Sequence, residues 1–300
     1  MRVSLLSQVP YRTFPSDFDK KHDSVITTPY GLVDNREIVA AHRDVLDNAM
    51  FAARSGFDGL AFLEHGQSSY DMAPNPSLLI AAVAYSTEVE SLPVALFPTG
   101  RSLGKTREPL RVAEEYGVLD AISNGRLMAG FPVGLPYDAA VNHGVPPVEI
   151  RARFEEGFSL VRRAWSAQQP FPFNGQFSQR ASVNPWPRPV QNPHPPIWLT
   201  GVGSPGTMKR AARDGFGYQM NGIFGSKSMG SKPFDMFWRF IEEAGHPANP
   251  CRLGFMQPIC VAKSMEEAER LYAPHVEYFY KLELAIRRHI WRHLQAQFRP

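Results

Sequence analysis

The chain has 300 residues, of which 43% are hydrophobic and 20% are charged, and its formal net charge is +3. This composition is that of a globular protein with a large core, and the length fits one α/β barrel or two small domains. Basic residues are spread along the chain apart from the extreme C-terminus, so we expect no nucleic-acid partner. The N-terminus lacks a signal-peptide pattern and no apolar run reaches about 18 residues, so we expect a cytoplasmic protein with no membrane contact.

Metal-binding and redox patterns are the next class to consider. Cys251 and Cys260 are the two cysteines, and their spacing fits no metal knuckle, redox pair or disulfide framework. His289 and His293 lie four residues apart in a helical stretch, but Ile290 stands where the zinc-protease pattern needs a glutamate. We therefore expect no metal site.

Short apolar runs alternate with amphipathic helical patterns in the first half of the chain, which is typical of βα units around a parallel sheet. Gly56 is placed to end one helix, Pro109 to begin a later one, and Gly125 to end that one. Strands are predicted over residues 2–6, 58–63, 94–97 and 127–130, and helices over residues 35–55, 76–85 and 110–122.

The second half repeats this alternation around one interruption. Residues 171–196 are rich in Pro, Asn and Gln, which predicts a long loop with a small hairpin rather than a domain boundary. Strands are predicted over residues 197–200, 218–221 and 253–262, and helices over residues 150–165, 204–215, 231–245 and from residue 264 onward.

The predicted strands number seven, whereas a closed barrel of this kind has eight. After Val276 the sequence is helical in pattern, aromatic and basic, with no strand or turn signal. We expect residues 1–300 to form a single domain whose C-terminal end, about residues 282–300, is atypical.

The active site of a parallel barrel lies at the C-terminal ends of its strands. His65 follows the second strand, and an imidazole titrates near neutral pH, so it is the best candidate for proton transfer. Glu64 faces the opposite side if the strand alternation continues, and we favour a structural ion pair for it.

A glycine-rich turn, Gly201-Val202-Gly203-Ser204, follows the fifth strand and leads into a helix. Such a turn presents backbone N–H groups at the positive end of a helix, where an anion such as a phosphate binds well. A tight turn without a ligand is the alternative, and the motif lacks the third glycine of a dinucleotide fingerprint.

Three blocks of the sequence resemble the luciferase-like flavin monooxygenases, and they fall in the order expected for that family. They are GFDGLAFLEH (residues 56–65), EPLRVAEEYGVLDAISNGRLMAGFPVG (108–134) and PVQNPHPPIWLTGVGS (189–204). The resemblance implies a (β/α)8 TIM barrel of the luciferase-like type, lacking its usual eighth strand here, with reduced FMN lying across the barrel mouth.

The resemblance also implies roles for individual residues. The family's catalytic histidine falls on His65, and a non-proline cis peptide bond beneath the flavin ring falls near residues 97–100. The residues implied to bind the cofactor are Phe97, Pro98, Thr99, Gly100, Phe131, Pro132, Gly201, Val202, Gly203 and Ser204.

The implied reaction uses reduced FMN from a separate flavin reductase and molecular oxygen to oxidise a small organic substrate, such as an aldehyde or a ketone. A homodimer formed through the early helices is implied as well. The chain departs from the family at Gly66, where luciferase itself has a second histidine. The loop after the third strand is unusually basic, and we favour solvated side chains for Arg101, Lys105 and Arg107 over contacts with a phosphate.

Other functions fit the same sequence. A deazaflavin-dependent oxidoreductase would use the same barrel mouth, and only the shape of the pocket over the ring would separate the two. A non-catalytic flavin-binding partner subunit is a third hypothesis, which the presence of His65 disfavours and the unusual C-terminus favours. A barrel hydrolase without flavin is disfavoured because no nucleophile or metal pattern occurs.

Overall fold

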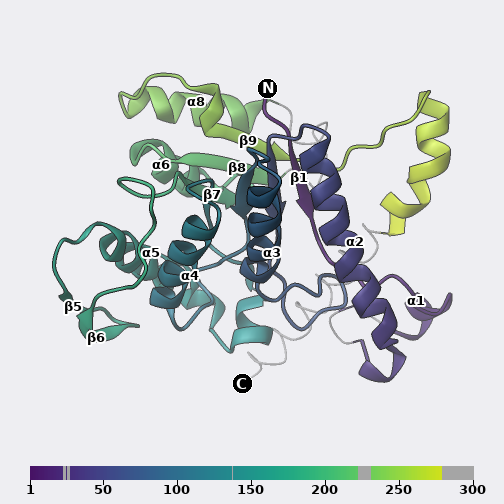
Figure 1. The fold of residues 1–300 in the computed structure, drawn as a ribbon, viewed down its shortest axis with the longest axis horizontal. Coiled ribbons are helices and arrows are strands. Elements are labelled where there is room, and N and C mark those ends of the chain that lie inside the picture. The colour runs from purple at the N-terminus through teal and green to yellow at the C-terminus, as the bar shows by residue number, and fades with distance from the viewer. Residues whose placement is uncertain (23–24, 26–27, 137, 222–230, 279–300) are drawn as a thin grey trace.

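The computed structural model describes residues 1–22, 25, 28–136, 138–221 and 231–278. Seven parallel strands lie at the centre of this part of the chain (Figure 1). They are β1 (Ser4–Ser7), β2 (Gly59–Phe62), β3 (Ala95–Pro98), β4 (Ala129–Pro132), β7 (Ile197–Gly201), β8 (Gly217–Asn221) and β9 (Leu253–Met256). The strands pair in this order, and β3 is joined to β4 by a single parallel bridge between Leu96 and Leu127. The predicted parallel sheet is confirmed.

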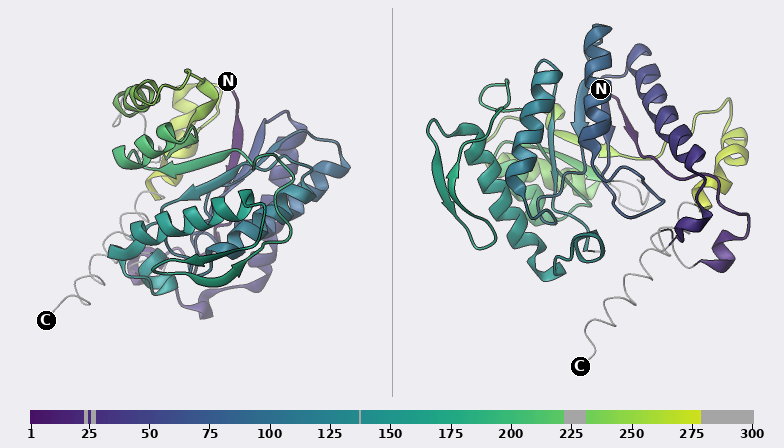
Figure 2. Two further views of the ribbon diagram at one scale, coloured as in Figure 1. Left: turned by 90° about the vertical axis from the view of Figure 1, so that its left-hand side faces the viewer. Right: turned by 60° about the horizontal axis from the view of Figure 1, so that its bottom comes forward.

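Helices follow the strands and cover the outside of the sheet, where α2 to α5 pack each against the next (Figures 1 and 2). They are α1 (Phe18–Lys21), α2 (Asn35–Arg54), α3 (Pro76–Val89), α4 (Pro109–Ile122), α5 (Ile150–Ser166), α6 (Pro205–Arg213) and α8 (Lys232–Glu243), and residues 265–278 are helical too. Within the described ranges, none of these helices has the length and apolar character needed to cross a membrane.

Local signals in the sequence explain the ends of these helices. Asp34 and Asn75 cap α2 and α3, since each side chain accepts a hydrogen bond from the backbone N–H two residues on. Pro109 is the first residue of α4, and Gly125 just beyond its end has a φ of +78°. Gly56, after α2, has a φ of +88°. The predicted boundaries at these three residues are confirmed.

The two faces of the sheet are distinguished by the contacts of alternate residues. The Phe131 ring of β4 lies 5.3 Å from Tyr116 of α4, and Tyr218 of β8 lies 5.9 Å from Phe237 of α8, so both point to the helices. Trp198 of β7 points the other way, because its ring lies 5.9 Å from Phe97 and would contact a Cβ at Gly217 at 2.4 Å. The ring of Trp198 therefore fills the inside of the curved sheet.

The predicted hairpin within residues 171–196 is confirmed. It consists of β5 (Phe171–Asn174) and β6 (Gln179–Val183), which pair antiparallel. Its turn is fixed by Glu156 of α5, whose carboxylate accepts hydrogen bonds from the backbone N–H groups of Gln176 and Phe177 at 2.6 and 3.0 Å.

The last predicted strand is shorter than expected. It ends at Met256 rather than at residue 262, because Pro258 offers no N–H for a strand ladder and residues 257–262 are exposed. Among the residues that the structure describes, β1 pairs with β2 alone and β9 with β8 alone. The predictions for residues 282–300, and for His289 and His293, lie outside the described residues. The single domain over residues 1–300 stays a prediction.

Candidate active site

A group of buried and half-buried charged side chains lies where the segments after β2, β3 and β4 meet. Lys105 Nζ is 2.9 Å from Glu64 Oε1 and 3.6 Å from Asp138 Oδ2, and these three side chains are 2%, 3% and 4% exposed. Arg101 Nη1 lies 3.2 Å from Glu64 Oε2, and its Nη2 pairs with Glu115 of α4 at 3.0 Å. We call Glu64, Arg101, Lys105, Glu115 and Asp138 the charge cluster.

His65 borders the charge cluster. Its Nδ1 lies 3.4 Å from Asp138 Oδ2, and its ring makes an edge contact with Tyr70 at 5.1 Å between centroids. The other carboxylate oxygen of Asp138 accepts a hydrogen bond from Asn142 Nδ2 at 3.0 Å. Asn142 Nδ2 also donates to the backbone oxygen of Gly66 at 2.7 Å. Asn142 therefore ties Asp138 to the backbone of the residue after His65.

The structural ion pair expected for Glu64 is confirmed, whereas the solvated side chains expected for Arg101 and Lys105 are wrong. The basic loop folds inward because two glycines allow it. A Cβ at Gly100 would lie 2.3 Å from the backbone nitrogen of Glu64, and one at Gly104 would lie 2.2 Å from the Val133 carbonyl. Arg107 is exposed, as expected.

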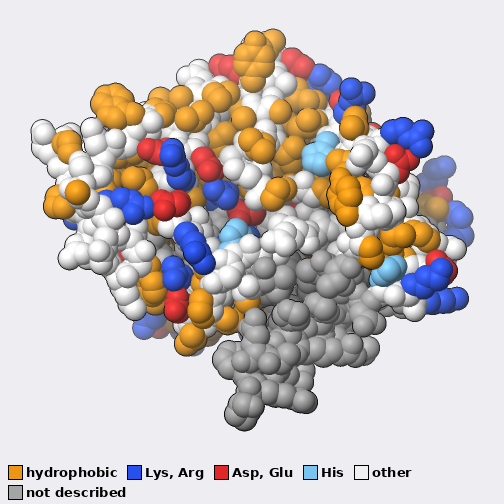
Figure 3. Space-filling view, turned by 90° about the horizontal axis from the view of Figure 1, so that it is seen from below, with side chains coloured by type: hydrophobic (Ala, Val, Ile, Leu, Met, Phe, Trp, Pro, Cys, Tyr) orange, Lys and Arg blue, Asp and Glu red, His pale blue; other side chains and the backbone are white. Residues whose placement is uncertain are grey.

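Figure 3 views the molecule from below, onto the end where the loops after β2, β3 and β4 lie. Basic and acidic side chains lie next to one another on this face, so the visible surface carries charges of both signs.

The expectation of a non-proline cis bond near residues 97–100 is wrong. Within the described residues, the cis peptide bonds are Trp186–Pro187 and Asn192–Pro193. Thr99 continues the sheet in an ordinary extended path, because its N–H and its hydroxyl both donate to the Phe62 carbonyl at 3.0 and 2.9 Å.

The other residues expected at the cofactor take different positions. Phe97 and Thr99 are alternate residues of the strand and lie on the inner face of the sheet. Pro98 is buried beside Gly130. The Phe131 ring packs among the aromatic rings of α4 and α5, so its side chain faces away from the mouth. Pro132 pairs with Thr200 on the inner face.

The glycine-rich turn lies between β7 and α6, as its sequence predicts. Gly203 has a φ of +95°, and its N–H donates to the Tyr218 hydroxyl at 3.0 Å. Ser204 is exposed, and its side chain makes no capping hydrogen bond. Sequence reasoning missed Arg151 of α5, whose guanidinium lies 3.2 Å from the Thr207 hydroxyl in the first turn of α6. This arrangement places a cation beside the turn.

Buried polar atoms without partners mark the inner face near the mouth. Thr200 and Gln219 are paired across β7 and β8, and they stand one layer beyond Trp198 toward the strand ends. Thr200 Oγ1 and Gln219 Oε1 are buried and make no hydrogen bond within the described part of the chain. Because buried polar atoms are normally paired, these two atoms each call for a polar partner.

Asp71 is a further buried carboxylate near His65. It is fully buried, and its Oδ1 accepts a hydrogen bond from the Val9 N–H at 2.9 Å. Burial raises the pKa of Asp71 to about 6, because a charged carboxylate is poorly solvated there. The charge of this group therefore changes in a mildly acidic pH range.

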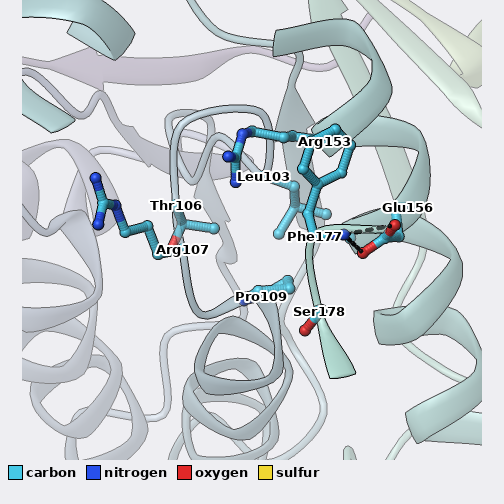
Figure 4. Close-up of a pocket in the computed structure, with 9 residues that line it drawn as sticks. Leu103, Thr106, Arg107, Pro109, Arg153, Glu156, Phe177 and Ser178 are labelled. Carbon is cyan, nitrogen blue, oxygen red and sulfur yellow. Dashed lines mark hydrogen bonds between the residues drawn. The ribbon is translucent and has the colours of Figure 1, made fainter. Parts of the chain in front are cut away.

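A small pocket between the basic loop, α5 and the hairpin is structural in character (Figure 4). Arg153 lies 4.4 Å over the Phe177 ring and pairs with Glu149 at 2.8 Å. The carboxylate of Glu156 faces the backbone N–H of Phe177. The charged groups at its centre are thus satisfied by the protein, and we assign the pocket to holding the hairpin in place.

Comparison with known proteins identifies the family. A sequence model of the family described as luciferase-like monooxygenase matches residues 24–299. The chain belongs to this family, which confirms the resemblance seen in its sequence.

Two named relatives use different cofactors. The oxygenase component of flavin-dependent trigonelline monooxygenase from Acinetobacter baylyi is 28% identical over 180 residues, which are 59% of this chain and 48% of that protein. F420-dependent glucose-6-phosphate dehydrogenase from Intrasporangium calvum is 28% identical over 185 residues, 59% of this chain and 53% of that protein. The chain spans about half the length of the curated relatives it matches.

Solved structures share the fold. Monooxygenase RslO1 from Streptomyces bottropensis has a TM-score of 0.75 at 24% identity, over 95% of this chain and 78% of that one. The oxygenating constituent of 3,6-diketocamphane monooxygenase from Pseudomonas putida, solved in complex with FMN, has a TM-score of 0.68 at 20% identity, over 94% and 77% of the two chains. The fold is therefore of the luciferase-like barrel type.

Proposed function

We propose that the protein is a flavin-dependent monooxygenase that uses reduced FMN and molecular oxygen to oxidise a small organic substrate, such as an aldehyde or a ketone. The observation that carries this proposal is the position of His65. It lies after β2 beside buried carboxylates, at the end of the sheet where barrels of this kind carry out their chemistry. Family membership and a flavin-dependent relative support it.

The residues of this chain fit a flavin. Thr200 and Gln219 have buried polar atoms without described partners, and these side chains would hold the polar edge of a flavin ring. The turn at residues 201–204 and the Arg151 guanidinium suit the phosphate. When bound, reduced FMN supplies the electrons with which oxygen is activated.

The protein's own groups would govern protons and water. His65 would hold or transfer a proton at its Nε2, because Asp138 adjoins its Nδ1. Phe97 and Trp198 line the inner face below the mouth with apolar surface, which excludes water from the reacting ring.

A deazaflavin-dependent oxidoreductase is the second candidate, because a relative that uses such a coenzyme matches a similar share of the chain. The same residues, Thr200, Gln219 and Trp198, would serve either coenzyme. They differ in whether the reduced coenzyme reacts with oxygen or the coenzyme exchanges a hydride with an organic substrate.

The proposed partners are a separate flavin reductase and a second copy of this chain. The oxygenase component of a flavin-dependent enzyme among the relatives supports the first. Exposed apolar side chains on neighbouring early helices support a homodimer, and they are Phe51 of α2, Leu78, Tyr85 and Val89 of α3, and Val118 and Ile122 of α4. A cytoplasmic location stays a prediction.

The test is an anaerobic titration of the protein with reduced FMN and, separately, with a reduced deazaflavin, followed by oxygen under rapid-scan absorbance. Tight binding of reduced FMN and multiphasic reoxidation that differs from that of free FMN are expected. Preference for the deazaflavin, without a reaction with oxygen, would establish the second candidate. Binding of neither would contradict both.

A further inference from the structure

We propose that Asp138 and Lys105 are positioning residues for His65, and that they hold its imidazole in the tautomer with the proton on Nδ1. The proposal rests on the function proposed above. It adds to that function the groups that fix the orientation and protonation of the histidine.

The geometry begins with one carboxylate oxygen. Asp138 Oδ2 lies 3.4 Å from His65 Nδ1 and 3.6 Å from Lys105 Nζ. A carboxylate beside one ring nitrogen of a histidine favours the proton on that nitrogen and leaves the other nitrogen as the acceptor. In that tautomer Nε2 of His65 is the unprotonated nitrogen, which is the one that accepts a proton.

Lys105 favours the charged form of this carboxylate. A buried aspartate surrounded by apolar groups tends to be protonated, whereas a cation within about 4–6 Å favours the ionised form. Lys105 is nearly inaccessible to solvent and stands between Glu64 and Asp138, so its ammonium serves both carboxylates. Glu64 in turn fixes the position of Lys105 through the 2.9 Å contact.

A second tie fixes the relative position of the two groups. Asp138–Asn142 forms one turn of π-helix, a form of helix often found at functional sites. Asn142 Nδ2 bridges Asp138 Oδ1 and the Gly66 carbonyl, so the residue after His65 is tethered to the turn that carries Asp138. Gln67 nearby has a φ of +50°, and its side chain donates to the Asn142 carbonyl at 3.4 Å. A non-glycine residue in this left-handed region is strained, and such strain is often found at functional sites.

A charge cluster can also serve stability alone, and the two roles predict different results. If Asp138 acts through His65, replacing Asp138 has no further effect once His65 is gone. If it acts on stability alone, its effect on the reaction is the same with or without the imidazole. A double-mutant cycle therefore separates the two roles.

The cycle comprises wild type, His65→Ala, Asp138→Asn and the double variant, each in the full chain. The probe is the rate of reoxidation of bound, chemically reduced FMN on mixing with oxygen. We expect Asp138→Asn to change this rate in the same direction as His65→Ala, and the double variant to lie within about twofold of His65→Ala. Additive effects would overturn the proposal. Lys105→Met should act in the same direction as Asp138→Asn.

Glu115→Gln is the matched control, because Glu115 belongs to the same charge cluster but contacts Arg101 rather than His65. It should leave the reoxidation rate within about twofold of wild type, a difference too small for a lost catalytic group. An equal effect of Glu115→Gln and Asp138→Asn would mean that any disturbance of the cluster suffices, which contradicts a positioning role for Asp138.

A measurement on the wild-type protein avoids the risk that a variant fails to fold. Nitrogen-15 NMR of the histidine-labelled full chain reports the tautomer of His65, whose signals are those lost in His65→Ala. A neutral His65 protonated on Nδ1 is expected, and predominant protonation on Nε2 would overturn the proposal. This result does not depend on turnover, so failure of the monooxygenase proposal would be seen separately, as an unchanged reaction in His65→Ala.

Discussion

The two halves of the barrel mouth differ in how their polar groups are satisfied. Around β1 to β3, Glu64 and Lys105 are buried, Arg101 is half-buried, and these charged side chains pair with one another. Around β7 and β8, the polar groups on the inner face are neutral, and buried atoms of Thr200 and Gln219 have no described partner. Arg101 Nε and Asp71 Oδ2 of the first half are also buried without a described partner, so the two halves differ in charge pairing rather than in completeness, and we propose that the neutral groups of the second half bind the cofactor.

This difference has a physical reason. A group that transfers protons gains from being held in one orientation before the substrate arrives, and buried ion pairs provide that rigidity. A group that binds a cofactor must keep its hydrogen-bonding capacity available, because a partner supplied by the protein would have to be displaced. Substitutions in each half should therefore affect different quantities.

The largest effect is expected in the half around β1 to β3, which we call the paired half. His65→Ala should lower turnover by roughly 10²-fold or more, the scale of a lost general acid or base. The dissociation constant for reduced FMN should change by only a few-fold, because the predicted contacts with the ring lie in the other half. Steady-state turnover and an anaerobic titration measure the two quantities, and unchanged turnover would remove His65 from the mechanism.

Asp71 gives the paired half a dependence on pH. Its pKa is about 6 in the folded protein and close to 3.9 when unfolded, so the folded state binds more protons between these values. This contribution to stability is fully present below about pH 4 and is lost as the pH rises through 6, by at most about 3 kcal/mol. Asp71→Asn should remove it. Urea unfolding at pH 4 and 7 tests this, and identical pH profiles of variant and wild type would contradict it.

Gly100 tests how tightly the paired half is assembled. Gly100→Ala would bring a Cβ to 2.3 Å from the backbone nitrogen of Glu64, which cannot move as a flexible side chain would. We expect a loss of about 1–3 kcal/mol in the free energy of unfolding. Gly206→Ala is the control in the other half, since a Cβ there meets nothing within 4 Å. Equal losses in both variants would contradict the close contact at Gly100.

The smallest effect is expected in the half around β7 and β8. Gln219→Leu removes one hydrogen bond to the ring, so the dissociation constant for reduced FMN should rise by the equivalent of about 0.5–1.5 kcal/mol. The stability of the protein without cofactor should not fall, since a buried unpaired polar group is replaced by an apolar one. Weaker binding without a loss in melting temperature would sharpen the contrast between the halves. Unchanged binding would place the ring elsewhere.

The sequence predicts the repeating fold better than it predicts the site. Hydrophobic periodicity and end signals such as Pro109 and Gly125 depend on neighbouring residues, and those elements were predicted within a few residues. The burial of Lys105 could not be predicted in this way. It depends on Gly100 lying against Glu64 and on Gly104 lying against Val133, which are contacts between distant segments.

Asp138 and Asn142 were missed for a similar reason, because they lie in a π-turn with no strand or helix periodicity. Thr200 could have been found from the sequence, whereas Gln219 could not. Both lie within predicted strands, and counting alternate residues from the aromatic Trp198 assigns Thr200 to the inner face. The pairing of β7 with β8, which sets the register of Gln219, requires the structure.

The placement of Trp198 has an optical consequence. Its indole occupies the layer immediately below Thr200 and Gln219, so a flavin held by those two side chains would lie against it. A flavin ring absorbs where indole emits, and stacking at contact distance quenches indole emission directly. The protein would then carry its own fluorescent reporter of cofactor arrival, whose dimming can be followed in the unlabelled chain without any catalytic turnover.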